Sequence, residues 1–135
     1  MLYGKVLIVD DESEILKLLE LELSSEGYIV VKAKTGKEAI MQAKTSLPDL
    51  IVMDIMMPGM DGAQAVKILK SDIKTKNIPI VFLTAILTKR EEKLQQMGVA
   101  IDGAYYPTIA KPFDSRELLM TINKVMYNNT KMVNK

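Results

Sequence analysis

The sequence has no cysteine and no histidine among its 135 residues. Without cysteine it can form no disulfide and no thiolate nucleophile, and without histidine it has no imidazole metal ligand and no histidine general base. Carboxylates, hydroxyls and amines are the side chains left for chemistry. A site built from carboxylates favours a hard cation such as Mg²⁺ over zinc or copper.

The chain also lacks an excess of charge of either sign, because 18 basic and 17 acidic side chains give a formal net charge of +1. These charges are spread along the whole length, so no basic patch is present to attract nucleic acid or anionic lipid. We therefore expect no direct binding of nucleic acid. With 48% apolar and 26% charged residues, the composition is that of one folded domain.

Long hydrophobic runs are absent as well. The longest, Ile78 to Leu87, is interrupted by Pro79 and Thr84 and is shorter than the ~18 residues that a membrane span needs. Near the N-terminus only Val6 to Val9 precede acidic residues, whereas the apolar region of a signal peptide takes about 7–15 residues. We expect a cytoplasmic protein with no membrane partner.

Short apolar runs alternate with segments of helical spacing along the chain. Strands are predicted at Lys5–Val9, Tyr28–Ala33, Leu50–Met53, Ile80–Leu83 and Tyr105–Ala110. Helices are predicted at Ser13–Glu26, Gly36–Lys44, around Ala65–Leu69, at Lys89–Met97 and from about Asp114 to Tyr127. Strands of near-continuous apolar residues between helices indicate an α/β fold with a parallel sheet covered on both faces.

The predicted domain covers residues 1–127. The remaining residues, 128–135, are polar and rich in asparagine, and we interpret them as a frayed terminus or the start of a linker.

Polar residues follow four of the five predicted strands, namely Asp10, Asp11, Asp54, Thr84 and Lys111. In open parallel sheets ligands bind beyond the carboxyl ends of the strands, where these residues lie. Three carboxylates gathered there would repel each other, and binding of a divalent cation, Mg²⁺ or Mn²⁺, would neutralise their charge. Such a metal site also binds phosphate. The ammonium of Lys111 is expected to keep Asp54 ionised and to offset phosphoryl charge.

Each of these residues also has an ordinary structural explanation. Asp11 with Glu14 resembles an N-cap and capping box, which would leave Asp10 as a solvated neighbour. Asp54 could cap a turn, Thr84 could be a strand-end hydroxyl, and Lys111 could be a surface lysine. Chance explains any one of them, but it explains their assembly at the ends of apolar strands poorly.

Four motifs in order resemble the response-regulator receiver domain over about Lys5 to Tyr127: Val6–Glu12 (VLIVDDE), Asp54–Gly62 (DIMMPGMDG), Thr84–Ala85 and Lys111–Phe113. The resemblance implies a flavodoxin-like (βα)5 three-layer sandwich, with a parallel five-stranded sheet in the order 2-1-3-4-5.

The resemblance also implies roles for individual residues. Asp54 matches the phosphoacceptor, Asp11 the direct Mg²⁺ ligand, Asp10 the residue that holds a coordinated water, and the backbone carbonyl of Met56 another metal ligand. Thr84 matches the hydroxyl that binds a phosphoryl oxygen. Lys111 matches the lysine that pairs with the site, and by resemblance its peptide bond to Pro112 is cis.

The implied reaction transfers a phosphoryl group from a phosphohistidine of a sensor histidine kinase or histidine phosphotransfer protein to Asp54, followed by hydrolysis. The domain would thus be a switch rather than an enzyme. Its output would pass to a downstream effector protein or a C-terminal output domain, with a phosphorylation-dependent homodimer as a further possibility. Met56 and Ala85 flank the site and offer no side chain that could activate water, so we expect slow dephosphorylation, and a lifetime of seconds would contradict this.

The sequence departs from the family before the fifth strand. Thr108 occupies the position, three residues before Lys111, where the family usually has a tyrosine or phenylalanine. The preceding residues, 98–103, are predicted to form an enlarged loop. Tyr105 and Tyr106 either take over the aromatic role or pack against a helix, and we favour packing. We expect signal output through an altered face at the fourth helix and fifth strand.

Three alternatives compete with this interpretation. A phosphatase of the haloacid-dehalogenase type needs a second aspartate two residues after the nucleophile, where this chain has Met56. A flavodoxin-like FMN carrier needs a Ser, Thr and Gly loop where the chain has residues 10–12, Asp-Asp-Glu. A degenerate receiver that only binds partners is disfavoured because the site residues are intact.

Overall fold

The computed structural model describes residues 4–85 and 99–133. Its strands are β1 (Lys5–Val9), β2 (Ile29–Ala33), β3 (Leu50–Asp54), β4 (Ile80–Ala85), β5 (Val99–Ile101), β6 (Ala104–Tyr106) and β7 (Thr108–Lys111). Its helices are α1 (Ser13–Ser25), α2 (Gly36–Ser46), α3 (Gly62–Ser71) and α5 (Ser115–Val133). The helix predicted at Lys89–Met97 lies outside the described residues.

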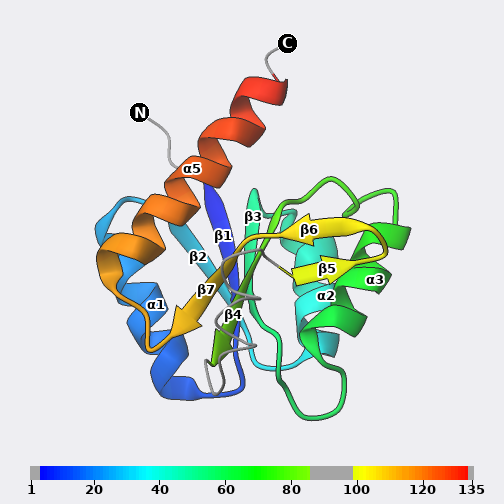
Figure 1. Cartoon of the computed structure of the whole chain (residues 1–135), viewed down its shortest axis with the longest axis horizontal. Coiled ribbons are helices and arrows are strands. Elements are labelled where there is room, and N and C mark those ends of the chain that lie inside the picture. The colour runs from blue at the N-terminus through cyan, green and yellow to red at the C-terminus, as the bar shows by residue number, and fades with distance from the viewer. Residues whose placement is uncertain (1–3, 86–98, 134–135) are drawn as a thin grey trace.

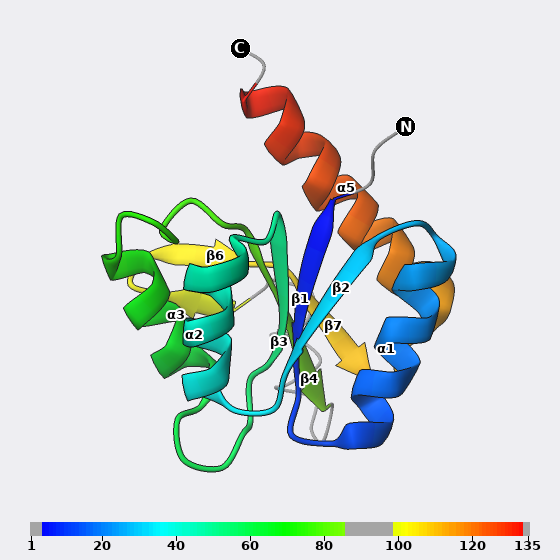
Figure 2. The same ribbon diagram turned by 180° about the vertical axis from the view of Figure 1, so that it is seen from behind.

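The main sheet has five parallel strands in the order β2-β1-β3-β4-β7. With β7 as the fifth strand, this is the order 2-1-3-4-5 that the sequence predicts. Helices α1 and α5 cover one face of the sheet, and α2 and α3 cover the other (Figures 1 and 2). The predicted α/β three-layer architecture is confirmed.

The core consists of two apolar layers, one on each face of the sheet. Along β4, Ile80 and Phe82 belong to the layer beneath α2 and α3, whereas Val81 and Leu83 belong to the layer beneath α1 and α5. This alternation follows from the two-residue period of a strand. All the residues of β3 are buried, as expected of a strand covered on both faces.

The predicted strand at Tyr105–Ala110 is wrong as a single element. It is divided at Pro107, which has no N–H to donate to a ladder, and only β7 joins the main sheet. Strands β5 and β6 form a separate antiparallel hairpin in which Ile101 pairs with Ala104. Asp102 and Gly103 connect them with φ angles of 49° and 84°. Two consecutive residues of positive φ are the requirement of a type I′ turn, so the supposed enlarged loop is largely a hairpin.

Helix α5 is longer than predicted. It continues past Tyr127 to Val133. Each added helical residue gains a backbone hydrogen bond, and asparagine costs at most about 0.7 kcal/mol relative to alanine. The end of α5 projects beyond the sheet (Figure 1). Within the described parts of the chain, no helix combines the length and apolarity needed to span a bilayer.

Candidate functional site

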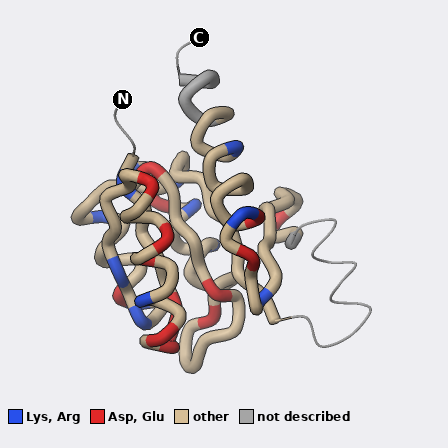
Figure 3. Tube along the Cα trace, turned by 90° about the vertical axis from the view of Figure 1, so that its left-hand side faces the viewer, with Lys and Arg blue, Asp and Glu red and all other residues tan. Residues whose placement is uncertain are grey.

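The carboxyl end of the sheet carries the residues that the sequence singles out. Asp10, Asp54 and Lys111 follow or end β1, β3 and β7, three strands that run in the same direction. The strand period places each of them on the same face as the residue two positions earlier. Those earlier residues all belong to the layer beneath α1 and α5: Ile8, Val52 and Ile109. Figure 3 shows Asp and Glu at this end of the molecule, with others distributed along the rest of the trace.

Lys111 joins the two buried carboxylates. Its Nζ lies 2.7 Å from Asp10 Oδ2 and 3.0 Å from Asp54 Oδ2. The contact with Asp54 is a hydrogen bond. The shorter contact with Asp10 is an ion pair that lacks hydrogen-bond geometry, since Asp10 Oδ2 accepts no hydrogen bond among the described residues. The side chain of Lys111 is only 14% exposed, so it is not an ordinary surface lysine.

Asp54 is 5% exposed at the end of β3. Its Oδ1 accepts a hydrogen bond from the backbone N–H of Met56 at 3.1 Å, and its Oδ2 accepts one from Lys111. Burial raises the pKa of Asp54, and this effect exceeds the lowering by Lys111. The expectation that Lys111 would keep Asp54 ionised by its charge is therefore incomplete, because burial opposes it.

The pKa of Lys111 is also raised, but here the effect of the neighbouring carboxylates outweighs that of burial. Burial alone would lower the pKa of Lys111, but its close contacts with the negatively charged carboxylates of Asp10 and Asp54 raise it overall. Lys111 is therefore a permanent cation at neutral pH. It holds together two carboxylates that would otherwise repel.

Asp11 does not cap α1. The N-cap of that helix is Glu12, which makes no side-chain capping hydrogen bond, so the capping box predicted for Asp11 and Glu14 as an alternative is wrong. Asp10 is fully buried rather than a solvated neighbour, and its Oδ1 accepts a hydrogen bond from the Glu12 N–H at 2.9 Å. The carboxylate of Asp11 is thus left at the exposed rim of the site.

Carboxylate oxygens of Asp10, Asp11 and Glu12 lie within 4.8 Å of one another. This donor set suits a hard divalent cation, and the buried Asp10 Oδ2 without a hydrogen bond has a lone pair to offer. The residues therefore fit Mg²⁺ or Mn²⁺. Glu12 was not predicted as a ligand, although the run Asp-Asp-Glu was the signal that could have pointed to it.

The remaining predicted residues lie around this centre. Thr84 and Ala85 end β4, with Ala85 opposite Lys111 in the ladder. The Thr84 hydroxyl donates a long hydrogen bond of 3.5 Å to the Ala85 carbonyl, and among the described residues it makes none to a carboxylate. Met56 is 74% exposed beside Asp54. The Lys111–Pro112 bond is cis, as predicted.

Helix α3 approaches the site closely through Gly62. A Cβ at this position would lie 2.6 Å from the Asp54 carbonyl oxygen and 3.2 Å from Phe82. The Gly62 N–H donates to the carbonyl of Ile55 at 2.8 Å. Asp61 forms a capping box with Gln64 at the start of α3. Only glycine can occupy position 62 without displacing the backbone behind Asp54.

Tyr106 lies on the α2 and α3 face of the sheet. Its ring meets Phe82 edge-on, with centroids 5.8 Å apart and an interplanar angle of 80°. Tyr106 thus packs on a residue of strand β4, whereas Tyr105 is 66% exposed. Thr108 is the first residue of β7 and pairs with Phe82 in the ladder.

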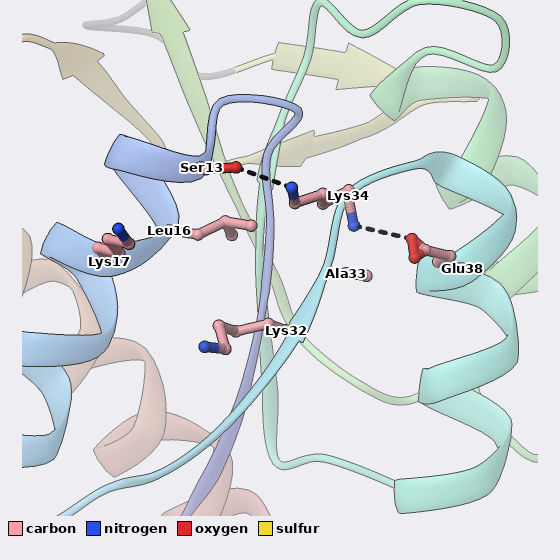
Figure 4. A pocket seen from close by; sticks show the side chains of 7 residues that line it. All are labelled: Ser13, Leu16, Lys17, Lys32, Ala33, Lys34 and Glu38. Carbon is pink, nitrogen blue, oxygen red and sulfur yellow. Dashed lines mark hydrogen bonds between the residues drawn. The ribbon is translucent and has the colours of Figure 1, made fainter.

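A pocket of about 370 Å³ lies between α1, β2 and the start of α2 (Figure 4). Two of its lysines have partners: Lys34 Nζ donates to Ser13 Oγ at 2.7 Å, and Lys32 pairs with Glu20 at 3.0 Å. None of the predicted site residues lines this pocket. It is therefore separate from the acidic site.

Comparison with known proteins identifies the family of this chain. Residues 6–123 match the family model of the response regulator receiver domain. The chain is 38% identical over 122 residues to the alkaline phosphatase synthesis transcriptional regulatory protein PhoP of Bacillus subtilis, covering 90% of this chain and 48% of that protein. It thus spans about half the length of this relative. Protein PilH of Pseudomonas aeruginosa is 37% identical, over 91% of this chain and 98% of PilH.

Solved structures agree with the fold. The chemotaxis protein CheY4 of Vibrio cholerae superposes with a TM-score of 0.77 at 30% identity, covering 90% of this chain and 98% of that one. A receiver domain of a modulated diguanylate cyclase from Desulfovibrio desulfuricans G20, described as an example of alternate folding, has a TM-score of 0.76 at 26% identity, covering 96% and 98%. The chain belongs to the response-regulator receiver domains of two-component signalling systems.

Proposed function

We propose that this domain accepts a phosphoryl group on Asp54 from a phosphohistidine of a partner protein, and that the acyl phosphate switches its contacts with other proteins. The observation that carries the proposal is the ammonium of Lys111, placed 2.7 Å from Asp10 and 3.0 Å from Asp54. A carboxylate nucleophile and a fixed cation next to it are what phosphoryl transfer needs, because the protein contributes mainly position and charge.

The transfer is an in-line displacement. An oxygen of the Asp54 carboxylate attacks phosphorus, and the new O–P bond forms as the P–N bond of the phosphohistidine breaks. The electron pair of that bond returns to the imidazole of the partner. Lys111 then offsets charge on the phosphoryl oxygens, and Thr84, at the end of the adjacent strand β4, is the hydroxyl within the site that can donate to one of them.

Asp10, Asp11, Asp54 and the backbone carbonyl of Met56 are the groups that would hold Mg²⁺ or Mn²⁺, with Glu12 at the rim. The cation supplies neutralisation of the carboxylates and of the incoming phosphoryl oxygens. The buried Asp10 Oδ2 and the proximity of the Asp10, Asp11 and Glu12 carboxylates support this assignment.

Return to the resting state requires water to attack phosphorus, which restores the Asp54 carboxylate and releases inorganic phosphate. Met56 and Ala85 are both exposed beside the site, and neither carries a group that can activate water. We infer slow dephosphorylation, and the domain catalyses only its own phosphorylation and dephosphorylation.

The phosphodonor is a sensor histidine kinase or a histidine phosphotransfer protein, since this chain has no histidine of its own. The recipient of the signal is a downstream effector protein or an attached output domain. A phosphorylation-dependent homodimer is a third form of output.

Incubation with acetyl phosphate and Mg²⁺, followed by intact-mass measurement, tests the proposal. The wild type gains the mass of one phosphoryl group, and Asp54→Ala gains none. Asp61→Asn, which replaces the half-buried acid that caps α3, keeps the gain and serves as the control. Equal phosphorylation of wild type and Asp54→Ala would overturn the proposal, and no gain in either protein would favour a receiver that only binds partners.

A further inference from the structure

We propose that the pocket between α1, β2 and the start of α2 is a binding site for a small organic carboxylate. The hydrocarbon part of the ligand lies on an apolar floor, and its carboxylate lies among lysines at the rim. No residue of the proposed phosphorylation site lines this pocket. Binding here is therefore independent of the proposed function.

The pocket has the size and the floor of a small-molecule site. Its volume of about 370 Å³ lies within the ~300–1,000 Å³ typical of ligand pockets, which combine apolar walls with a few polar groups. Leu16 and Ala33 are 4% and 3% exposed, and Figure 4 shows Leu16 reaching from α1 toward β2. Both residues belong to the packed core, so the apolar floor is already formed before a ligand binds.

Three lysines surround this floor: Lys17, Lys32 and Lys34. Lys32 and Lys34 are two residues apart along β2 and its end, so their side chains leave the chain on the same side. That side faces α1, because Lys34 Nζ donates to Ser13 Oγ at 2.7 Å. Lys32 Nζ likewise lies 3.0 Å from Glu20 Oε1. Lys17 lies on α1 itself, and its ammonium has no partner among the described residues.

The charges at the rim of the pocket do not balance. Ser13 is neutral, so its hydrogen bond leaves the charge of Lys34 uncompensated. Glu38 is the acidic residue of the lining, and its Oε2 accepts from the backbone N–H of Lys34 at 3.3 Å. With the carboxylate that pairs with Lys32, two negative groups face the three lysines. One positive charge remains, and a ligand with a single carboxylate would neutralise it.

The edge of the sheet adds a backbone donor next to these lysines. Strand β2 is the outer strand, with β1 as its neighbour. The Ile29 N–H donates to the Gly4 carbonyl at 3.1 Å. The Ala33 carbonyl accepts from the Asp10 N–H at 3.2 Å. These alternate residues bond to β1, so the N–H of Lys32 is directed away from β1, where a carboxylate oxygen can accept from it.

Titration of isotope-labelled protein with hexanoate, followed in amide NMR spectra without divalent cations, tests the proposal. Hexanoate shifts the signals of residues that line the pocket, among them Ser13 and Lys32. Hexanol has the same hydrocarbon chain without the charge, and it binds several times more weakly. Hexylamine carries the opposite charge and causes no shifts there. Added salt weakens the binding of hexanoate more than that of hexanol, because salt screens exposed charges.

Three variants assign the contacts. Lys17→Gln raises the Kd of hexanoate about two- to fivefold, the range expected for one exposed ion pair. Glu38→Gln lowers the Kd by a similar factor, because it removes a carboxylate that repels the ligand. Lys124→Gln removes an exposed lysine of α5 outside the pocket and leaves the Kd unchanged. The amide spectrum of each variant also shows whether the variant is folded, and the three ligands compared on the wild type need no variant.

Several results would overturn the proposal. Equal affinity for hexanoate and hexanol would mean that the lysines contribute nothing to binding. An unchanged Kd in both Lys17→Gln and Glu38→Gln would place the carboxylate elsewhere. Absence of shifts at millimolar hexanoate, or shifts confined to residues outside the pocket, would exclude a carboxylate site between α1 and β2.

Discussion

At the scale of single residues, the site depends on one cation between two buried anions. Asp10 is fully buried and Asp54 nearly so, and Lys111 is the ammonium that both of them meet. Buried charges are tolerated when they are paired, and the removal of one partner leaves the other uncompensated. Lys111 is consequently as important for the fold as for the proposed chemistry.

Replacement of Lys111 by methionine is expected to lower the free energy of unfolding by about 3 kcal/mol, the loss typical of a broken buried ion pair. Urea denaturation without divalent cations measures it. Lys32→Met removes the exposed pair with Glu20 and is expected to cost less than about 1 kcal/mol. Equal losses in the two variants would show that Lys111 is not a structural counterion.

The raised pKa of Asp54 predicts a pH dependence of stability. The folded protein holds the Asp54 proton more tightly than the unfolded chain, in which the carboxyl group has its ordinary pKa of 3.8. The contribution of protonated Asp54 to the free energy of unfolding is therefore complete below pH 3.8. It is lost as the pH rises through the higher pKa of Asp54 in the folded protein. Without metal, Asp54→Asn gains stability over the wild type as the pH rises through this range. Urea titrations at a series of pH values measure the difference in free energy of unfolding between the two proteins. If the wild type became more stable than the variant with rising pH, the raised pKa of Asp54 would be contradicted.

At the scale of elements, local signals differ between the helices. Helix α2 has a side-chain cap, because Thr35 Oγ1 accepts from the Glu38 N–H at 3.0 Å. Helix α1 has none, since its N-terminus begins directly after the acidic residues of the site. The N-cap position of α1 is taken by Glu12, which belongs to the acidic cluster and makes no capping hydrogen bond.

Thr35→Ala is expected to reduce the free energy of unfolding by about 1 kcal/mol through loss of the α2 cap. Thr45 lies in the last turns of the same helix, where its hydroxyl donates to the Met41 carbonyl at 2.8 Å. Thr45→Ala is expected to be neutral or slightly stabilising, because alanine has the higher helix propensity. Chemical denaturation of both variants compares the positions. Similar losses would mean that the Thr35 hydrogen bond contributes little.

The β5–β6 hairpin depends on the backbone of its turn. Gly103 has φ 84°, and a Cβ there would meet nothing within 4 Å, so the cost of a side chain is conformational alone. Gly103→Ala is expected to destabilise by about 1–2 kcal/mol, whereas Asp102→Asn, which tolerates positive φ, is expected to be neutral. Hydrogen exchange of residues 99–106 locates the effect, and unchanged protection in Gly103→Ala would exclude a type I′ turn.

At the scale of the whole molecule, ligand and fold are linked. A cation that binds only the folded state stabilises it by about 2.7 kcal/mol at 100 times its Kd. Mg²⁺ is therefore expected to raise the melting temperature of the wild type, and EDTA to reverse the rise. Asp11→Asn loses the effect, whereas Asp61→Asn keeps it, because Asp61 caps α3 outside the acidic cluster. A rise that survives Asp11→Asn would place the metal elsewhere.

The sequence by itself determined the parallel α/β architecture and its two covered faces, and the resemblance to the receiver family implied the sheet order. Apolar strands, helical spacing and polar residues at strand ends are local properties, and parallel strands bring their ends together by topology. The cis bond before Pro112 and the receiver family also followed from motifs. The sheet order, the cis bond and the family are confirmed, whereas the place of the site stays a prediction.

Other features were decided only by the tertiary structure. Burial of Asp54 sets the direction of its pKa against the effect of Lys111, and burial is a property of the assembled layers. The division of the last strand at Pro107 depends on which residues reach β4, although the Asp102–Gly103 pair was a local signal of the hairpin. The packing of Tyr106 on Phe82 joins residues from separate strands. Pattern along the chain fixes which elements form, and competition for space in the core decides which side chains meet.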